Sequence, residues 1–160
     1  MSISKIITIF CAIFFIFGAA VIHSDEIVKT VPQIIKEAKS QISEVTVMEL
    51  KNDLDAGKEI VLLDVRTAEE FDAGHLPKSV NLQRGLLEFL IGKKYPEKDT
   101  NLVLYCRTDP RAALCTNTLK EMGYANAKNL TGGFKAWSEA GYSVHNRHGE
   151  FKMLAFEKKE

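Results

Sequence analysis

The feature that most constrains the fold is a pair of short apolar runs in which apolar and polar side chains do not alternate. The runs cover residues 60–63 and 102–105. Continuous hydrophobicity over so short a length is typical of strands that are buried on both faces of a parallel sheet. Segments with helical spacing lie between and after these runs, so the sequence predicts an α/β fold with helices on both faces of the sheet.

Capping and turn residues indicate where the other elements begin and end. Thr46 is followed three residues later by Glu49, a capping box that predicts a helix over 47–55, ended by Gly57. The further elements expected are helices from residue 68 to the turn at Gly74, over 112–122 and over 134–140, short strands over 79–82 and 127–130, and a helix or partly apolar flap over 85–91.

Residues 1–24 have the pattern of a secretory signal peptide. Lys5 precedes an apolar run from Ile6 to Ile22, and small residues follow its phenylalanines. An uncleaved membrane anchor is the alternative, because the run lies at the lower end of the roughly 17–25 residues that span a bilayer. We therefore expect a periplasmic or otherwise exported domain, or one anchored in the inner membrane and facing the periplasm.

The chain after the leader divides into three parts. Residues 25–43 place apolar side chains at helical spacing and predict an amphipathic lead-in helix, whose apolar face packs on the domain or binds a partner. The domain itself is expected over 44–144, and the tail over 145–160 follows no recognisable pattern. The 21 basic and 21 acidic residues balance without a basic block, so we expect no nucleic-acid partner.

Cys106 stands directly after the second apolar run, and parallel α/β folds carry their chemistry at the carboxyl ends of strands. A loop that leads into a helix can turn its N–H groups toward an anion, and nearby cations favour a thiolate. We interpret Cys106 as a nucleophilic thiolate that solvent can reach, with Arg111 best placed to bind an anionic substrate. The loop residues expected to line the substrate site are Arg107, Thr108, Asp109, Pro110 and Arg111.

Other roles for the cysteines stay open at this point. Cys106 could be a structural core residue, or it could form a disulfide with Cys115, which would block the chemistry. Cys115 shares a helical face with Leu119 and Met122, so we expect it to be buried and inert.

Three separated motifs make residues 44–144 resemble a single-domain rhodanese, a sulfurtransferase module. The segments are "LLDVRTAEEFDAGHLPKSVNL", similar to the first family signature, "VLYCRTDPRA", similar to the active-site loop, and "LTGGFKAW", similar to the closing motif. The resemblance implies a five-stranded parallel sheet flanked by helices on both faces. It also implies a persulfide on Cys106, formed from a small donor such as thiosulfate and passed to a thiol or cyanide-like acceptor, without metal or organic cofactor.

The loop departs from the family pattern at two positions. The fourth loop residue is commonly glycine in the family and is Asp109 here, and the following Pro110 has no N–H group. An acid beside the anion site would disfavour anionic donors. We therefore predict weak or unusual handling of thiosulfate, unless the Asp109 side chain points outward.

Three further residues of the first motif are expected to support the site. Asp64 and Arg66 stand at a strand end, where ion pairs and hydrogen bonds hold neighbouring loops, although an acid–base role is the alternative. His75 is expected to stabilise a turn, with a general-base role as its alternative. The histidines of the tail have no partners at ligand spacing, so we expect no metal site.

Two rival functions fit the same residues. One is a catalytically weak binding or sulfur-carrier module that keeps the fold. The other is a relative of cysteine phosphatases or arsenate reductases, which the C-x4-R spacing of Cys106 and Arg111 disfavours because those phosphatases use C-x5-R. The sequence does not indicate an oligomeric state.

Overall fold

The two apolar runs form neighbouring parallel strands at the centre of the molecule. Strand β2 (Val61–Asp64) pairs with β4 (Leu102–Tyr105), and their register places Leu63 opposite Leu104. All four residues of β4 are buried, which explains why this strand lacks alternation. The computed structural model describes residues 28–153, so the leader over 1–24 lies outside the described residues.

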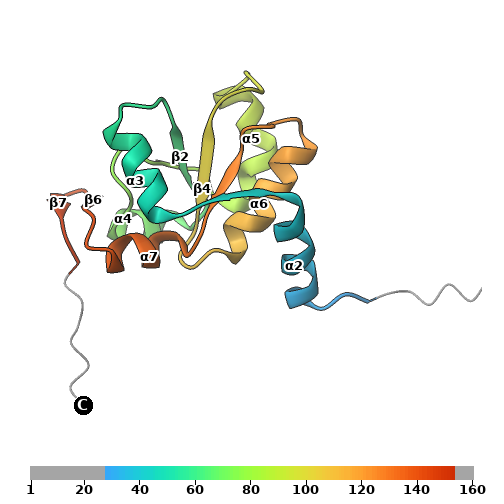
Figure 1. Ribbon diagram of the computed structural model, residues 1–160, viewed down its shortest axis with the longest axis horizontal. Coiled ribbons are helices and arrows are strands. Elements are labelled where there is room, and N and C mark those ends of the chain that lie inside the picture. The colour runs from blue at the N-terminus through green and yellow to red at the C-terminus, as the bar shows by residue number, and fades with distance from the viewer. Residues whose placement is uncertain (1–27, 154–160) are drawn as a thin grey trace, which may run out of the picture.

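Shorter strands complete a five-stranded parallel sheet, which confirms the predicted fold class (Figure 1). The strand order is β1-β5-β4-β2-β3. The added strands are β1 (Ser43–Val45), β3 (Val80–Asn81) and β5 (Lys128–Leu130). The helical elements are α2 (Val31–Gln41), α3 (Val47–Asp55), α4 (Ala68–Ala73), the 3-10 turn η1 (Arg84–Leu86), α5 (Leu87–Lys94), α6 (Pro110–Glu121) and α7 (Gly133–Glu139).

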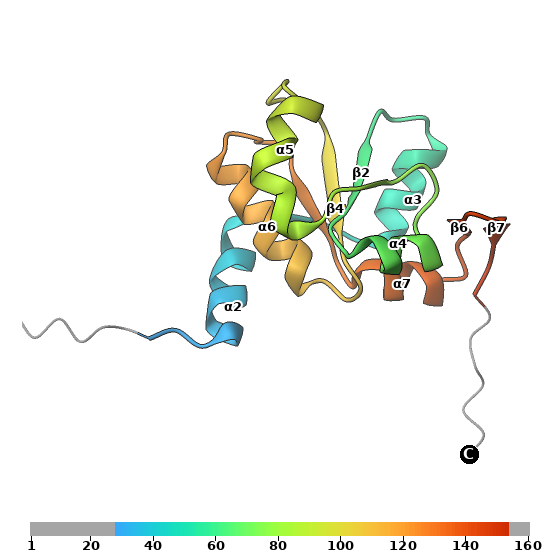
Figure 2. The same ribbon diagram turned by 180° about the vertical axis from the view of Figure 1, so that it is seen from behind.

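Successive side chains of the central strands point to opposite faces and build two cores. On one face Leu63 and Leu104 pack with buried apolar residues of α5 and α6. On the other face Leu62 and Val103 pack with buried residues that include Trp137 of α7 and a leucine of α3. Figure 2 shows α5 and α6 together on one side of the sheet, with α3 and α7 on the other.

The local signals place most element boundaries within two residues. The capping box of Thr46 and Glu49 is present, and its helix covers Val47–Asp55 as predicted. Helix α6 begins at Pro110, two residues before the predicted start, because proline fits the first turn, where its missing N–H has no helical partner. The segment over 85–91 is helical, within η1 and α5.

The lead-in segment forms a shorter helix than its pattern suggests. Thr30 caps α2, which packs beside α6, and Ala38 is buried in that contact. Val31 and Ile34 stay exposed, so only part of the apolar surface of α2 packs on the domain. None of the helices within residues 28–153 has the length and apolarity needed to span a membrane.

The residues just after position 144 are ordered, although their sequence shows no pattern. Strands β6 (Val144–Asn146) and β7 (Gly149–Phe151) form an antiparallel hairpin. Val144 is fully buried, and His145 exchanges two backbone hydrogen bonds with His75, at 2.9 and 2.8 Å. The domain boundary predicted at residue 144 falls within strand β6 of this hairpin. The strands are too short for their periodicity to be recognised in the sequence.

Candidate active site

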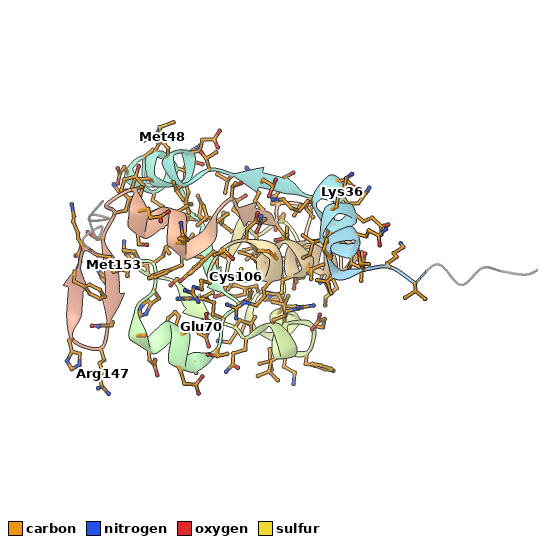
Figure 3. The ribbon with its side chains drawn as sticks, turned by 90° about the horizontal axis from the view of Figure 1, so that it is seen from below. Lys36, Met48, Glu70, Cys106, Arg147 and Met153 are labelled. Atoms are coloured by element: carbon orange, nitrogen blue, oxygen red, sulfur yellow. The ribbon has the colours of Figure 1, made fainter. Side chains whose placement is uncertain are left out.

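Cys106 lies at the carboxyl end of β4, where the chain turns through a short loop into α6. The backbone N–H of Asp109 donates a hydrogen bond to Cys106 Sγ, with a nitrogen–sulfur distance of 3.2 Å. A loop amide is thus directed at the sulfur, which is the arrangement expected of an anion site. Figure 3 shows Cys106 near the middle of the molecule, with Glu70 close by.

The surroundings of Cys106 correct one expectation from the sequence. Only 1% of the residue is exposed, so solvent does not reach the thiol freely in this conformation. Arg107 and Thr108, which follow it in the loop, are exposed and lie on the outside. The sequence places Cys106 at a strand end but carries no signal for how closely the loop folds over it.

The second cysteine within residues 28–153 is Cys115. Both cysteines are free thiols, so the disulfide alternative is wrong for this structure. Cys115 is 2% exposed, and burial raises the pKa of its thiol to about 12. These properties agree with the inert role expected for it.

The first turn of α7 also holds the loop after Cys106. Backbone N–H groups of Phe134 and Lys135 donate to the carbonyl oxygens of Cys106 and Arg107, at 2.8 and 2.9 Å. Gly133 has a φ of 56°, and a Cβ atom there would stand 2.4 Å from the Cys106 carbonyl oxygen. Glycine is required at this contact because both the backbone conformation and the space exclude a side chain.

Arg111 is bound by a carboxylate that sequence reasoning did not assign to the site. Its Nη1 and Nη2 atoms pair with the two carboxylate oxygens of Glu70, at 2.7 and 2.8 Å. This hydrogen-bonded pair lowers the pKa of Glu70 to about 2. The pKa of Arg111 is raised, mainly by its hydrogen bonds to Glu70 and to a smaller degree by Cys106. The only local signal at Glu70 is its capping box with Thr67, which predicts a helix start.

The Asp109 carboxylate is held by residues away from the sulfur. Oδ2 accepts from Lys39 Nζ at 2.5 Å, and Oδ1 accepts from Asn129 Nδ2 at 2.5 Å. The hydrogen bond to Asp109 is also the main reason that the pKa of Lys39 is raised. Lys39 of α2 therefore pairs with the charge of Asp109 and Asn129 of β5 donates to its other oxygen, which weakens the reason for expecting anionic donors to be repelled.

Asp64 and Arg66 form a buried ion pair at the end of β2. Arg66 Nε contacts Asp64 Oδ1 at 2.9 Å, and Arg66 Nη2 donates to the carbonyl oxygen of Gly74 at 2.7 Å. The Nδ1 atom of His75 lies 2.9 Å from the carbonyl oxygen of Phe71, and the imidazole stacks on the phenyl ring of Phe71. These contacts tie β2 to the turn after α4 and bring neither Asp64 nor His75 into contact with the sulfur.

A cleft of about 350 Å³ opens beside the loop. Its lining includes the three charged residues Arg66, Glu70 and Arg107, and Phe134 forms part of its apolar wall. Residues after position 144 also line it, namely Phe151 and Met153. A larger cavity of about 510 Å³ lies under α3 and Trp137 and contains no loop residue, so size does not mark the site here. Within residues 28–153 no group of acidic, histidine and cysteine side chains is arranged to hold a metal.

The sequence around this site matches a known protein family. The model of the rhodanese-like domain matches residues 46–140, which include both Cys106 and Gly133. The chain belongs to the rhodanese-like family. Lys39 and the hairpin β6–β7 of this rhodanese-like protein lie outside the matched residues.

Two curated relatives differ in how much of their length is matched. The probable adenylyltransferase/sulfurtransferase MoeZ of Mycobacterium tuberculosis is 33% identical over 97 residues, which are 61% of this chain but only 25% of that protein. A sulfurtransferase of Allochromatium vinosum is 28% identical over 103 residues, which are 64% of this chain and 94% of that protein.

Among solved structures, a Rhodopseudomonas palustris protein is similar with a TM-score of 0.69 and 30% identity. The match covers 74% of this chain and 96% of that one. That protein is described as being of unknown function and a possible tyrosine phosphatase.

Proposed function

We propose that this rhodanese-like protein is a sulfurtransferase that carries sulfur as a persulfide on Cys106. The observation that carries the proposal is the Asp109 N–H group directed at Cys106 Sγ from the loop after β4. Hydrogen bonds to a charged group favour the charged form, so this contact supports a thiolate. Membership of the rhodanese-like family and the sulfurtransferase relatives support the same reaction class.

The proposed reaction has two displacements and needs no external oxidant or reductant. The Cys106 thiolate attacks the outer sulfur of thiosulfate, an S–S bond forms, and the bond to the central sulfur breaks so that sulfite leaves with its electron pair. A thiolate or cyanide acceptor then attacks the outer sulfur of the persulfide, and the Cys106 thiolate is restored. Splitting one transfer into two steps is the usual benefit of covalent catalysis.

The burial of Cys106 adds a requirement to this reaction. A donor must reach a residue that is 1% exposed, so the loop after Cys106 has to move during each cycle. The ion pair of Arg111 and Glu70 lies at the end of that loop and occupies the guanidinium that an anionic donor would use. We infer that the donor exchanges with Glu70 for Arg111 as the loop opens.

The decisive experiment is incubation of the purified full chain with thiosulfate, followed by intact-mass measurement and by addition of cyanide. The proposal expects a mass gain of one sulfur atom on Cys106 and release of thiocyanate. Cys106→Ser abolishes both, whereas Cys115→Ser, the matched control, keeps them. Absence of an adduct with thiosulfate, persulfides and polysulfides alike would refute the proposed function.

The burial of Cys106 also favours a second candidate, a sulfur-carrier or binding module with little turnover. Such a module forms the persulfide slowly and releases thiocyanate at a negligible rate. A phosphatase would instead hydrolyse an aryl phosphate in a reaction lost in Cys106→Ser. The same protein preparation distinguishes the three activities.

Export is proposed on the leader alone. The apolar run in residues 1–24 supports a periplasmic or membrane-anchored location. Fractionation of cells that express the full chain tests it, and recovery of the unprocessed chain in the cytoplasm would contradict it.

A further inference from the structure

Asp109 has a backbone conformation that residues other than glycine rarely adopt. Its φ is 119° and its ψ is −54°. This conformation directs its N–H toward Cys106 Sγ, and residues held in sparsely populated regions persist only where the surroundings over-determine them. The contacts of Asp109 are therefore expected to hold the loop in place.

A lysine ammonium group and an asparagine amide, both from distant parts of the chain, supply those contacts. Lys39 lies on α2, 70 positions before Asp109, and Asn129 lies on β5, 20 positions after it. Each group binds a different oxygen of the same carboxylate, whose side chain is only 14% exposed. With both oxygens bound, rotation of the carboxylate is restricted, and the backbone attached to it is restricted as well.

Glu44 on β1 connects the same groups from the side. Its carboxylate accepts a hydrogen bond from Asn129 Nδ2 at 2.8 Å and pairs with Lys39 Nζ at 3.1 Å. Asn129 is fully buried, and its Oδ1 has no hydrogen-bond partner among the described residues. The Asn129 amide thus donates to two carboxylates, and Lys39 pairs with both of them.

We propose that Lys39 is a positioning residue for Cys106, acting through the Asp109 carboxylate to keep the Asp109 N–H directed at the sulfur. The proposal rests on the proposed role of Cys106 as nucleophile. Lys39 precedes the part of the chain that the family model matches, so this contact joins the lead-in helix to the loop in this protein.

Other charged groups near the sulfur come from different elements and are separate from this contact. Arg111 of α6 is paired with Glu70 of α4. Lys39, Glu44 and Asp109 form a second group linked through Asn129. A change at Lys39 therefore alters the second group and leaves the ion pair of Arg111 in place.

The test measures the fraction of Cys106 present as thiolate at neutral pH in the full chain. The readout is thiolate ultraviolet absorbance, taken as the difference between each protein and the same protein carrying Cys106→Ser. Lys39→Met is expected to lower this fraction severalfold, up to about tenfold if the hydrogen bond to the sulfur is lost entirely. Lys39→Arg, which keeps a cationic donor, restores most of it.

Lys36→Met is the matched control. Lys36 lies on the same helix, is exposed, and is placed at the outer side of α2 away from Cys106 in Figure 3. This control leaves the thiolate fraction unchanged. Far-ultraviolet circular dichroism confirms that each variant is folded before its absorbance is compared.

A double substitution separates positioning from a direct effect of the Lys39 charge. Glycine adopts positive φ readily, so in an Asp109→Gly background Lys39→Met has no further effect on the thiolate fraction. The proposal is overturned if Lys39→Met and Lys36→Met behave alike, or if the Lys39→Met effect is undiminished in the Asp109→Gly background. The expected absorbance changes without any sulfur adduct in the native protein would refute the proposed function and leave this inference standing.

Discussion

At the scale of single residues, two separate ion pairs hold the loop after Cys106. Arg111 is held by Glu70 and Asp109 is held by Lys39, whereas the third loop charge, Arg107, is exposed. Both contacts join residues that are far apart in the sequence. An incoming anion therefore meets Arg111 only after displacing the Glu70 carboxylate.

Replacing Glu70 by glutamine tests the first pair. Folding lowers the pKa of Glu70 from 4.5 to about 2, so its stabilisation is fully present above pH 4.5 and is lost as the pH falls toward 2. Glu70→Gln is expected to lower the free energy of unfolding by about 1–2 kcal/mol at pH 7, a value reduced because both side chains are partly solvated.

Urea unfolding at pH 7 and at pH 3 measures this effect. The stability difference between the native protein and Glu70→Gln shrinks at pH 3, whereas Asp72→Asn, at an exposed residue of the same helix, is the control and changes the stability little at either pH. A difference as large at pH 3 as at pH 7 would show that the ion pair is not its source.

At the scale of elements, the loop is fixed by the ends of two helices. Helix α6 begins with Pro110 directly after the loop, and α7 begins at Gly133, whose neighbours donate two backbone hydrogen bonds to the loop carbonyls. Movement of the loop that admits a donor therefore has to break or carry along the contact with α7. The second glycine of the motif "TGGF", Gly133, allows the backbone of α7 to approach the backbone of the loop closely.

Gly133→Ala is expected to destabilise the protein by more than 2 kcal/mol, because the added methyl group meets backbone rather than a flexible side chain. Thermal or urea unfolding measures the loss. Gly92→Ala is the control, since Gly92 lies in α5 and a Cβ there meets nothing within 4 Å. That change should be neutral or stabilising by up to about 1 kcal/mol. Equal effects of the two substitutions would contradict the close approach of α7 to the loop.

At the scale of the whole molecule, both described thiols are buried in the same core but differ in what covers them. Cys106 is covered by a loop at the carboxyl ends of the strands, whereas Cys115 lies within α6 among core residues. Loops open with smaller free energies than packed helices, so the two sulfurs should differ in reactivity although their exposures are alike.

Iodoacetamide is expected to alkylate Cys106 at least tenfold faster than Cys115 in the native full chain. Burial raises the pKa of Cys115 to about 12, which leaves little thiolate there at neutral pH. Peptide mass analysis after timed quenching distinguishes the two sites, and denatured protein shows their intrinsic reactivity. If Cys106 reacts only at the rate of global unfolding, no donor can reach it in the native state, and the proposed sulfur transfer fails.

Much of this architecture could be predicted from local signals. The continuous apolar runs predict β2 and β4, and the capping box of Thr46 and Glu49 predicts α3 to the residue. The hairpin after residue 143 could not be predicted, because its strands are too short to show a period. Its position depends on pairing between His75 and His145, which only the folded chain brings together.

The sequence by itself determined the parallel sheet, the helices around it and the place of Cys106 at a strand end, because hydrophobic periodicity and capping act over a few residues. Only the tertiary structure decided that Cys106 is covered, that Arg111 is paired with Glu70 and that Lys39 holds Asp109. Those contacts join residues 41 and 70 positions apart. Such distances are bridged by the packing of whole elements, and no local pattern records which side chains then meet.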